Sequence, residues 1–462
     1  MSAPTAMINP PTGDSEAAAA PTLLDALARA PAAAGLVVRA LERAKDRKAL
    51  RLAHPQLLGA VDEATTKLKA DFRAAATPAA RPPTPARWPR LEELTIRWPD
   101  ASALEALGAE AWAGLRSLRV EWSMFGAKAQ LDVPTARALA AALQRMPALR
   151  ALELQHVALL DGAFAALFRA SSADATPQLR SLALHRVHLT PAATRMLAAT
   201  GWHLEELDLR FNEDVGAAGV AALVAAPTFA LRRLDLANCG LDAAALLCVA
   251  NAPWPLEELN FFGNDLSAAA AGPALAALSR HRGLRTLNLN CCQLSAAGFK
   301  ALVEAAWPAL TSLETFVSEG VAFTGPHALG AAAFAGFPAL EEANFENVAL
   351  GEAGARLLAS RRWPRLVKLG LFYAGLGDAA VAALARGSWP VLERLDLRRN
   401  YFSAPPTLEA ARRWAPVLEE LEASEEIDPS ASEQSDSDAG SSDTGSSASD
   451  QSASDTGSSD GE

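Results

Sequence analysis

The sequence predicts an α/β solenoid built from about a dozen copies of one strand-plus-helix unit, and two observations support this fold class. First, the pattern L-x-x-L-x-L recurs about every 27 residues, starting at Leu91, Leu115, Leu149, Leu179, Leu204, Leu231, Leu256, Leu284, Leu310, Leu340, Leu366, Leu392 and Leu418. Second, each copy passes from alternating to helical spacing of its apolar residues. One strand and one helix cannot bury their apolar faces alone, so neighbouring units must stack.

The copy at residues 284–307 shows both halves of the unit. Leu287 and Leu289 alternate with polar residues, which predicts a short strand with its leucines turned into the core. The second half predicts a helix with one apolar face. The residues of that face are Phe299, Leu302, Val303 and Ala306.

Two further features recur at the joints of the units. The bend after the strand carries a small polar residue where backbone groups turn inward, and we assign this position to structure. Its residues are Asn212, Cys239, Asn264, Cys292 and Asn400. A Trp-Pro pair before several strands stops the helix and places an indole over the joint. The pairs are Trp88-Pro89, Trp254-Pro255, Trp307-Pro308, Trp363-Pro364 and Trp389-Pro390.

The period and the Asn-or-Cys alternation resemble the ribonuclease-inhibitor class of leucine-rich repeats over most of residues 86–423. The resemblance implies a leucine-rich-repeat solenoid, a horseshoe with parallel strands on the concave face and helices on the convex face. Some units depart from the pattern. The step after Leu115 is 34 residues, and Thr315 and Ala343 replace core leucines.

Charge is distributed unevenly along the 462 residues. The net charge is -11, and residues 424–462 hold eleven acidic residues and no Lys or Arg. The remainder is balanced, with 42 acidic against 42 basic residues, so the basic surface of a nucleic-acid binder is not expected. We predict a disordered Ser/Asp-rich tail. It could tether a basic partner, cover arginines of the groove, or act only as a disordered extension that keeps the protein in solution.

The compartment is predicted from cysteine usage and hydropathy. The four cysteines have no spacing typical of a disulfide framework, which favours a reducing environment. No signal peptide and no membrane span is expected. We predict a cytoplasmic protein of the cytosol, with the nucleus or the cytoskeleton left open, and no membrane partner.

Composition divides the chain into five regions. We expect disorder in residues 1–21, a helical segment in 22–77, a Pro-rich linker in 78–87, repeats in 88–423 and the acidic tail in 424–462.

The helical segment contains LRLAHPQLLGAVD at residues 50–62, which resembles the second half of an F-box. This resemblance implies a module that binds the adaptor subunit of a cullin-based ubiquitin ligase while the repeats present a substrate. The module would be formed by Leu23, Leu27, Leu36, Leu41, Leu50, Leu52 and Leu57. The alternative is a helical cap that shields the first repeat.

The residues between the inward leucines should line the concave face. Directly between the second and third leucines lies a row of acids and amides: Glu153, Asp208, Asp235, Asn260, Asn288, Glu314, Asn344 and Asp396. The next positions combine aromatic, basic and polar residues, which favour protein interfaces. The predicted partner-binding residues are Arg97, Trp98, Trp122, His156, His185, Arg210, Phe211, Phe262, Asn290, Phe316, Glu346, Phe372, Tyr373 and Arg398.

No motif for catalysis, metal binding or a cofactor is present, since the chain lacks GxxxxGK[ST], HExxH, CxxC and GxSxG. We therefore expect a non-enzymatic scaffold that binds a protein partner in the groove, without a cofactor. An acidic tail after such repeats is also found in Ran GTPase-activating proteins, which leaves that function as an alternative beside a simple cytoskeletal or signalling scaffold.

Overall fold

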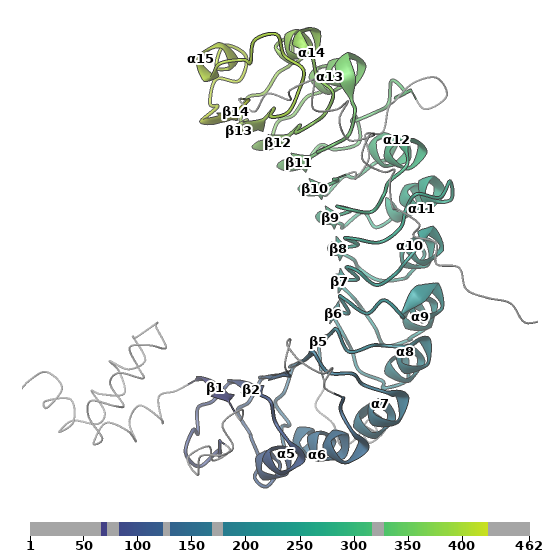
Figure 1. Ribbon diagram of the computed structural model, residues 1–462, viewed down its shortest axis with the longest axis vertical. Helices are drawn as coiled ribbons and strands as arrows, with labels where there is room; N and C mark the ends of the chain where they lie inside the picture. Colours follow the sequence, from purple (N-terminus) through teal and green to yellow (C-terminus); the bar gives the residue numbers. More distant parts are fainter. Residues whose placement is uncertain (1–65, 72–82, 123–129, 169–178, 317–327, 424–462) are drawn as a thin grey trace, which may run out of the picture.

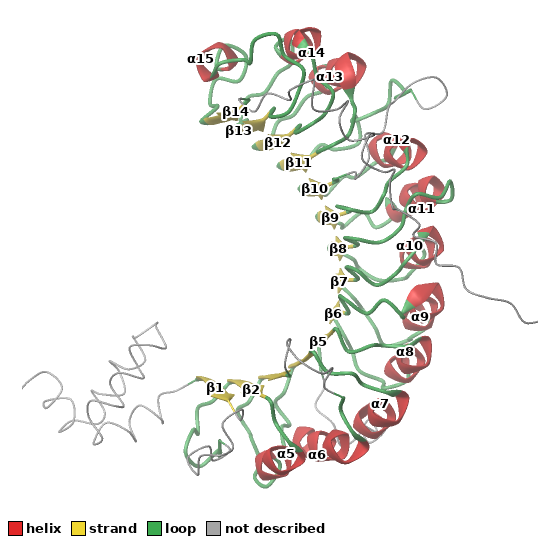
Figure 2. Cartoon of the chain, in the orientation of Figure 1, coloured by secondary structure: helices red, strands yellow, loops and turns green. Residues whose placement is uncertain are grey.

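The computed structural model describes residues 66–71, 83–122, 130–168, 179–316 and 328–423. Within these residues, fourteen strands form one parallel sheet and are hydrogen-bonded in sequence order from β1 to β14. The sheet lines the inside of a horseshoe, and the helices follow one another along its outside (Figures 1 and 2). The predicted arrangement of strands and helices is confirmed.

All thirteen strands expected from the leucine pattern are present. They are β2 (Glu93–Arg97), β3 (Ser117–Glu121), β4 (Ala151–Gln155), β5 (Ser181–His185), β6 (Glu206–Asp208), β7 (Arg233–Asp235), β8 (Glu258–Asn260), β9 (Thr286–Asn288), β10 (Ser312–Glu314), β11 (Glu342–Asn344), β12 (Lys368–Gly370), β13 (Arg394–Asp396) and β14 (Glu420–Glu422). The central residue of every three-residue strand from β6 to β13 is a buried Leu or, in β11, Ala343. Stacking these residues builds one continuous core along the array.

The sheet begins one strand earlier than the sequence pattern indicated. β1 (Lys67–Asp71) pairs in parallel with β2, and Leu68 packs against the core as the leucines of the repeats do. The prediction of a helical segment over residues 22–77 is therefore wrong for residues 67–71. These five residues form a strand, because pairing with the edge of β2 satisfies their backbone groups. Part of the linker differs too. The amides of Arg87 and Trp88 donate to the Thr84 carbonyl, so residues 84–88 form a turn instead of an extended segment.

The described helices lie on the convex side. They are α5 (Ala101–Leu107), α6 (Val133–Gln144), α7 (Asp161–Phe168), α8 (Pro191–Ala198), α9 (Gly216–Val224), α10 (Ala243–Ala250), α11 (Ala271–Leu278), α12 (Ala296–Glu304), α13 (Gly351–Ala359), α14 (Asp378–Leu384) and α15 (Leu408–Ala411). Several begin at a side chain that accepts a bond from the backbone amide three residues later. These caps are Asp100, Asp132, Thr190, Asp242, Ser295 and Thr407.

Buried tryptophans of the Trp-Pro pairs close the ends of three helices. The indole nitrogen of Trp307 donates to the Leu302 carbonyl at 2.9 Å, which satisfies one of the orphan acceptors in the last turn of α12. Trp363 and Trp389 make the same contact with the carbonyl five residues earlier. The structural role assigned to these residues is confirmed. α12 ends at Glu304, so the expectation that Ala306 lies on the buried helix face is wrong, and Ala306 is exposed.

The Asn-or-Cys position bonds the backbone of adjacent repeats. In Asn212, the side-chain oxygen accepts from the amides of Val187 (3.0 Å) and Leu189 (3.1 Å). Its nitrogen donates to the carbonyls of Leu184 (2.7 Å) and Leu209 (2.6 Å). In Cys239, the thiol donates to the Leu209 carbonyl at 3.1 Å. The structural assignment of this position is confirmed.

The irregular units keep their register in the sheet. Leu313 of β10 aligns with Ala343 of β11, and the hydroxyl of buried Thr315 donates to the Asn344 carbonyl at 2.8 Å. Phe345 lies between the rings of Phe299 and Phe334, with centroid distances of 5.9 and 5.5 Å. A large aromatic core residue thus accompanies the small Ala343. On the convex side, residues 331–336 form turns in place of a helix.

Candidate partner-binding face

Alternation along the strands places three rows of side chains on the concave face. We define the first row as the residue before the central leucine, the second row as the residue after it, and the third row as the residue two positions further on. In β4 these are Ala151, Glu153 and Gln155, which are half-buried, while Leu152 and Leu154 between them are buried. The predicted row of acids and amides is therefore the second row.

The predicted partner-binding residues separate into two groups. Nine belong to the third row on the concave face: Arg97, His185, Arg210, Phe262, Asn290, Phe316, Glu346, Phe372 and Arg398. Four lie one residue later, at the edge where the chain leaves the strand with a positive φ: Trp98, His156, Phe211 and Tyr373. Trp122 is only 9% exposed and belongs to the core, so its prediction as an exposed contact is wrong.

His185 lies inside a network of charged side chains. Its ring nitrogens lie 2.7 Å from Asp208 Oδ2 and 3.5 Å from Glu153 Oε1, and its side chain is only 12% exposed. Arg119 pairs with Glu153, and Arg210 pairs with Asp208. The contacts of His185 with Glu153 and Asp208 connect its strand to both neighbouring strands, so His185 is held by the protein itself and is not the exposed contact expected from the sequence.

Two neighbouring aspartates of the second row have opposite pKa shifts. Burial opposes ionisation of Asp208, but hydrogen bonds from His185 and Arg210 outweigh it and hold the pKa of this carboxyl below its ordinary value. Burial and the nearby charge of Asp208 raise the pKa of Asp235. Asp235 accepts bonds from the Ala237 amide and the Asn260 side chain, both at 3.0 Å. In the central groove, hydrogen-bond donors therefore stabilise the charge of Asp208, whereas the charge of the neighbouring Asp235 is destabilised by burial.

The arginines of the third row already have acidic partners. Arg97 donates to Glu121 at 2.7 Å. Arg398 lies 2.7 Å from Asp396 and 2.8 Å from Glu422. They remain about one-third exposed, so a partner can still contact them, but much of their charge is compensated within the protein.

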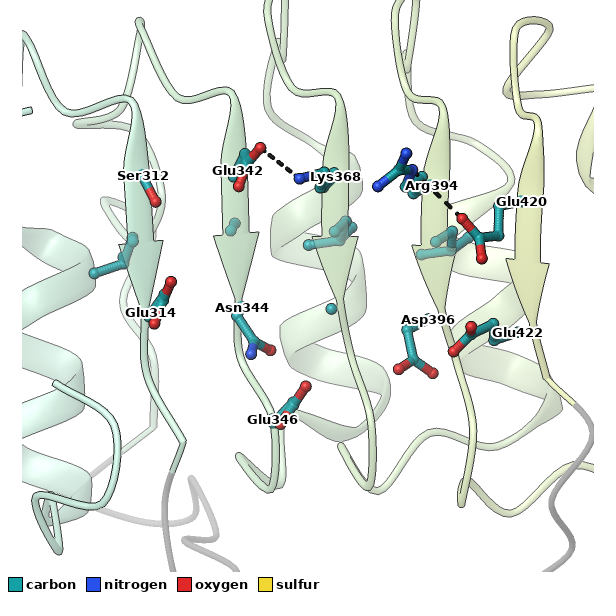
Figure 3. Close-up of a pocket in the computed structure, with 15 residues that line it drawn as sticks. Ser312, Glu314, Glu342, Asn344, Glu346, Lys368, Arg394, Asp396, Glu420 and Glu422 are labelled. Atoms are coloured by element: carbon teal, nitrogen blue, oxygen red, sulfur yellow. Dashed lines mark hydrogen bonds and ion pairs between the residues drawn. The ribbon is translucent and has the colours of Figure 1, made fainter. Parts of the chain in front are cut away.

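A hollow in the concave face between β10 and β14 was missed by sequence reasoning. It has a volume of about 290 Å³ and is centred on the second row, where Gly370 has no side chain between Asn344 and Asp396 (Figure 3). The first row beside it pairs Lys368 with Glu342 and Arg394 with Glu420. Only the register of β11, β12, β13 and β14 brings these residues together, although each is separated from the next by 26 residues of sequence.

Other kinds of site were sought in the described residues. No group of three or more His, Cys, Asp or Glu side chains there could hold a metal ion. None of the helices in that part of the chain is long and apolar enough to cross a membrane. The predicted adaptor-binding leucines, Leu23 to Leu57, lie outside the described residues.

Comparisons with known proteins agree with this architecture. A family model described as Leucine Rich repeat matches residues 203–224 and 282–303, which contain β6 with α9 and β9 with α12. A solved structure described as "Crystal structure of Rad7 and Elc1 complex in yeast" is similar with a TM-score of 0.47 and 17% identity, covering 85% of this chain and 92% of that chain. A similarity at this level carries no argument about partners. No curated protein matches the sequence.

Proposed function

We propose that this leucine-rich-repeat solenoid is a non-enzymatic interaction scaffold that holds a protein partner on its concave face. The observation that carries the proposal is the third row of the sheet, in which the half-buried rings of Phe262, Phe316 and Phe372 alternate with polar and charged residues. Aromatic rings contribute large contact areas at a small cost in entropy, and they dominate the energy of many interfaces. Within the described residues, no helix covers this side of the sheet (Figure 2).

The test is capture of partners by the full chain and by a variant with Phe262, Phe316 and Phe372 replaced by Ala. The matched control replaces the exposed convex-side residues Leu160 and Leu247 by Ala. We expect the triple variant to lose the specific partners while its melting temperature stays near that of the wild type, because the three rings are only partly buried. Loss of capture in the control, with normal capture by the triple variant, would move the site to the convex side.

We further propose that residues 22–77 carry the adaptor-binding function of an F-box-type substrate receptor, and that the repeats are of the ribonuclease-inhibitor class. The first point is supported by the F-box-like sequence of residues 50–62, which ends five residues before β1 begins. The second is supported by the alternation of Asn and Cys at the bend.

The adaptor proposal must be tested on the full chain, because a fragment ending at residue 85 would separate β1 from β2. Leu50→Glu with Leu52→Glu should abolish binding of the purified adaptor and leave capture of the concave-face partner intact. If the unmodified chain does not bind the adaptor, the segment is a cap for the first repeat.

A further inference from the structure

We propose that the hollow between β10 and β14 receives an arginine side chain from an extended segment of the partner. The guanidinium would bind Glu314 and Glu346, and the aliphatic stem would lie over Gly370. This inference rests on the proposed function and specifies the chemistry of the partner. Three features of the described residues carry it: the shape of the hollow, its uncompensated charge and its aromatic flank.

The shape fits one long side chain. The volume of about 290 Å³ lies at the lower limit of small-molecule sites. The floor exists because Gly370 has no Cβ, and a Cβ there would lie 2.5 Å from the side-chain oxygen of Asn344. That oxygen is buried and has no hydrogen-bond donor. The Asn344 side chain thus occupies the place where a Gly370 Cβ would stand and forms part of the floor of the hollow.

The charge of the hollow favours a cationic ligand. Its lining contains six carboxylates but only two basic residues, Lys368 and Arg394. Lys368 binds Glu342 at 2.6 Å and Arg394 binds Glu420 at 3.4 Å, while Asp396 and Glu422 share an arginine of the third row. The two remaining carboxylates are those of Glu314 and Glu346.

Glu314 and Glu346 have no ion pair with any described residue. Glu314 accepts one hydrogen bond, from the side chain of Asn290 at 2.9 Å. Both are half-buried, so their charges are less well screened than those of fully exposed carboxylates. In Figure 3 the two carboxylates lie beside Asn344, at the end of the strands away from the paired cations. The guanidinium of the incoming arginine is proposed to contact both.

The aromatic flank selects arginine over lysine. Phe316 and Phe372 occupy the third row on β10 and β12, on either side of Glu346 on β11. The protein already places two guanidinium groups over the Phe372 ring, those of Arg398 at 5.6 Å and Arg399 at 5.7 Å from its centroid. A planar guanidinium can stack on such a ring and bind a carboxylate in bidentate fashion, which a lysine ammonium cannot do.

We assign the arginine to a basic segment of another molecule. Residues 424–462 are excluded by charge, because they contain eleven acidic residues and no Lys or Arg. A second copy of this chain is an alternative occupant that the experiment separates. If the full chain self-associates and Glu314→Gln with Glu346→Gln abolishes that association, the occupant is another copy, and the assignment to a different partner is overturned.

The experiment measures binding of fluorescein-labelled hexa-arginine and hexalysine to the full chain by fluorescence anisotropy at about 150 mM salt. One variant carries Glu314→Gln and Glu346→Gln. The matched control carries Glu105→Gln and Glu110→Gln, which remove the same charge from exposed residues in and just after α5 on the convex side.

We expect the groove variant to weaken hexa-arginine binding about tenfold, as for the loss of one well-formed charged hydrogen bond. The control should change it less than twofold. Phe316→Leu should reduce the preference for hexa-arginine over hexalysine. Equal weakening by both glutamate pairs, or equal affinity for the two peptides, would overturn the inference.

Failure of this inference is distinguishable from failure of the proposed function. If the triple phenylalanine variant loses its captured partner while the groove variant keeps both that partner and hexa-arginine, the concave face binds a partner but not through this arginine. Unchanged capture by both variants would refute the concave-face function itself. The melting temperature of each variant is measured to check that it remains folded.

Discussion

The Asn212 side chain offers the most direct test of how neighbouring repeats are held together. It is fully buried and bonds four backbone groups: the amides of Val187 and Leu189 and the carbonyls of Leu184 and Leu209. Asn212→Ala leaves the two amides and the Leu184 carbonyl without a partner, whereas the Leu209 carbonyl still accepts from the Cys239 thiol at 3.1 Å. Each unsatisfied buried group costs about 1 to 3 kcal/mol, and partial relaxation of the loop recovers some of this. We therefore expect the variant to lose about 3 to 5 kcal/mol of folding free energy.

The assay is hydrogen exchange followed by mass spectrometry, because a repeat array can open locally and does not unfold as one two-state unit. The amides of Val187 and Leu189 should exchange much faster in Asn212→Ala, while peptides from β12 to β14 remain protected. The control is Asn251→Ala. It removes two exposed bonds, one to the Leu247 carbonyl at 2.9 Å and one from Arg280 at 3.2 Å, and should cost less than about 1 kcal/mol because water can replace both partners.

Unchanged exchange across residues 184–189 in Asn212→Ala, with a stability loss no greater than that of the control, would refute the reasoning. The side chain at the bend would then only fill space in the core, and its hydrogen bonds would not stabilise the contact between repeats. The large difference expected between the two asparagines follows from burial and from the number of bonds, since the residue type is the same.

Three further predictions concern other groups of the core and the groove. Trp363→Phe should lower the free energy of local opening, measured by hydrogen exchange, by about 1 kcal/mol more than Trp254→Phe does, because only the Trp363 indole nitrogen has a hydrogen-bond partner. Asp235→Asn should stabilise the protein at neutral pH, and this gain should disappear as the pH falls through the raised folded pKa toward the ordinary value of 3.8. A pH series of thermal melts that shows the gain growing on acidification would contradict the sign. Cys239 and Cys292, whose pKa is raised by burial to about 12, should resist a maleimide in the folded chain at about pH 7.5, whereas the other two cysteines react. Mass spectrometry that finds all four labelled at one rate would refute this protection.

The fold could be predicted because the same sequence pattern recurs in each repeat and predicts the same local structure each time. Each L-x-x-L-x-L copy supplies one strand, and errors at irregular copies such as that of Ala343 are corrected by their neighbours in the sheet. β1 was missed because KLKAD carries one leucine, and its strand exists only through pairing with β2. A backbone that takes its structure from a tertiary partner leaves little local signal in the sequence.

The candidate site was less predictable, because exposure depends on packing that the pattern does not encode. Trp122 occupies the edge position of its repeat, as Trp98 does, yet only Trp122 is buried. His185 was placed correctly on the concave face, but its ring is held by Glu153 and Asp208 from the two adjacent strands. These two contacts join residues 32 and 23 positions apart in the sequence, and they follow only from the register of the strands.

The hollow at Gly370 shows most clearly why binding chemistry must be read across repeats. A glycine in a strand is a weak position for packing when its own repeat is considered alone. In the sheet, the same glycine separates Asn344 from Asp396 and opens space beside a carboxylate flanked by two phenylalanines. Filling that space by Gly370→Ala would bring a methyl group against the Asn344 oxygen without changing any charge. The recognition property therefore belongs to the row of side chains formed by β10 to β13, and no single repeat contains it.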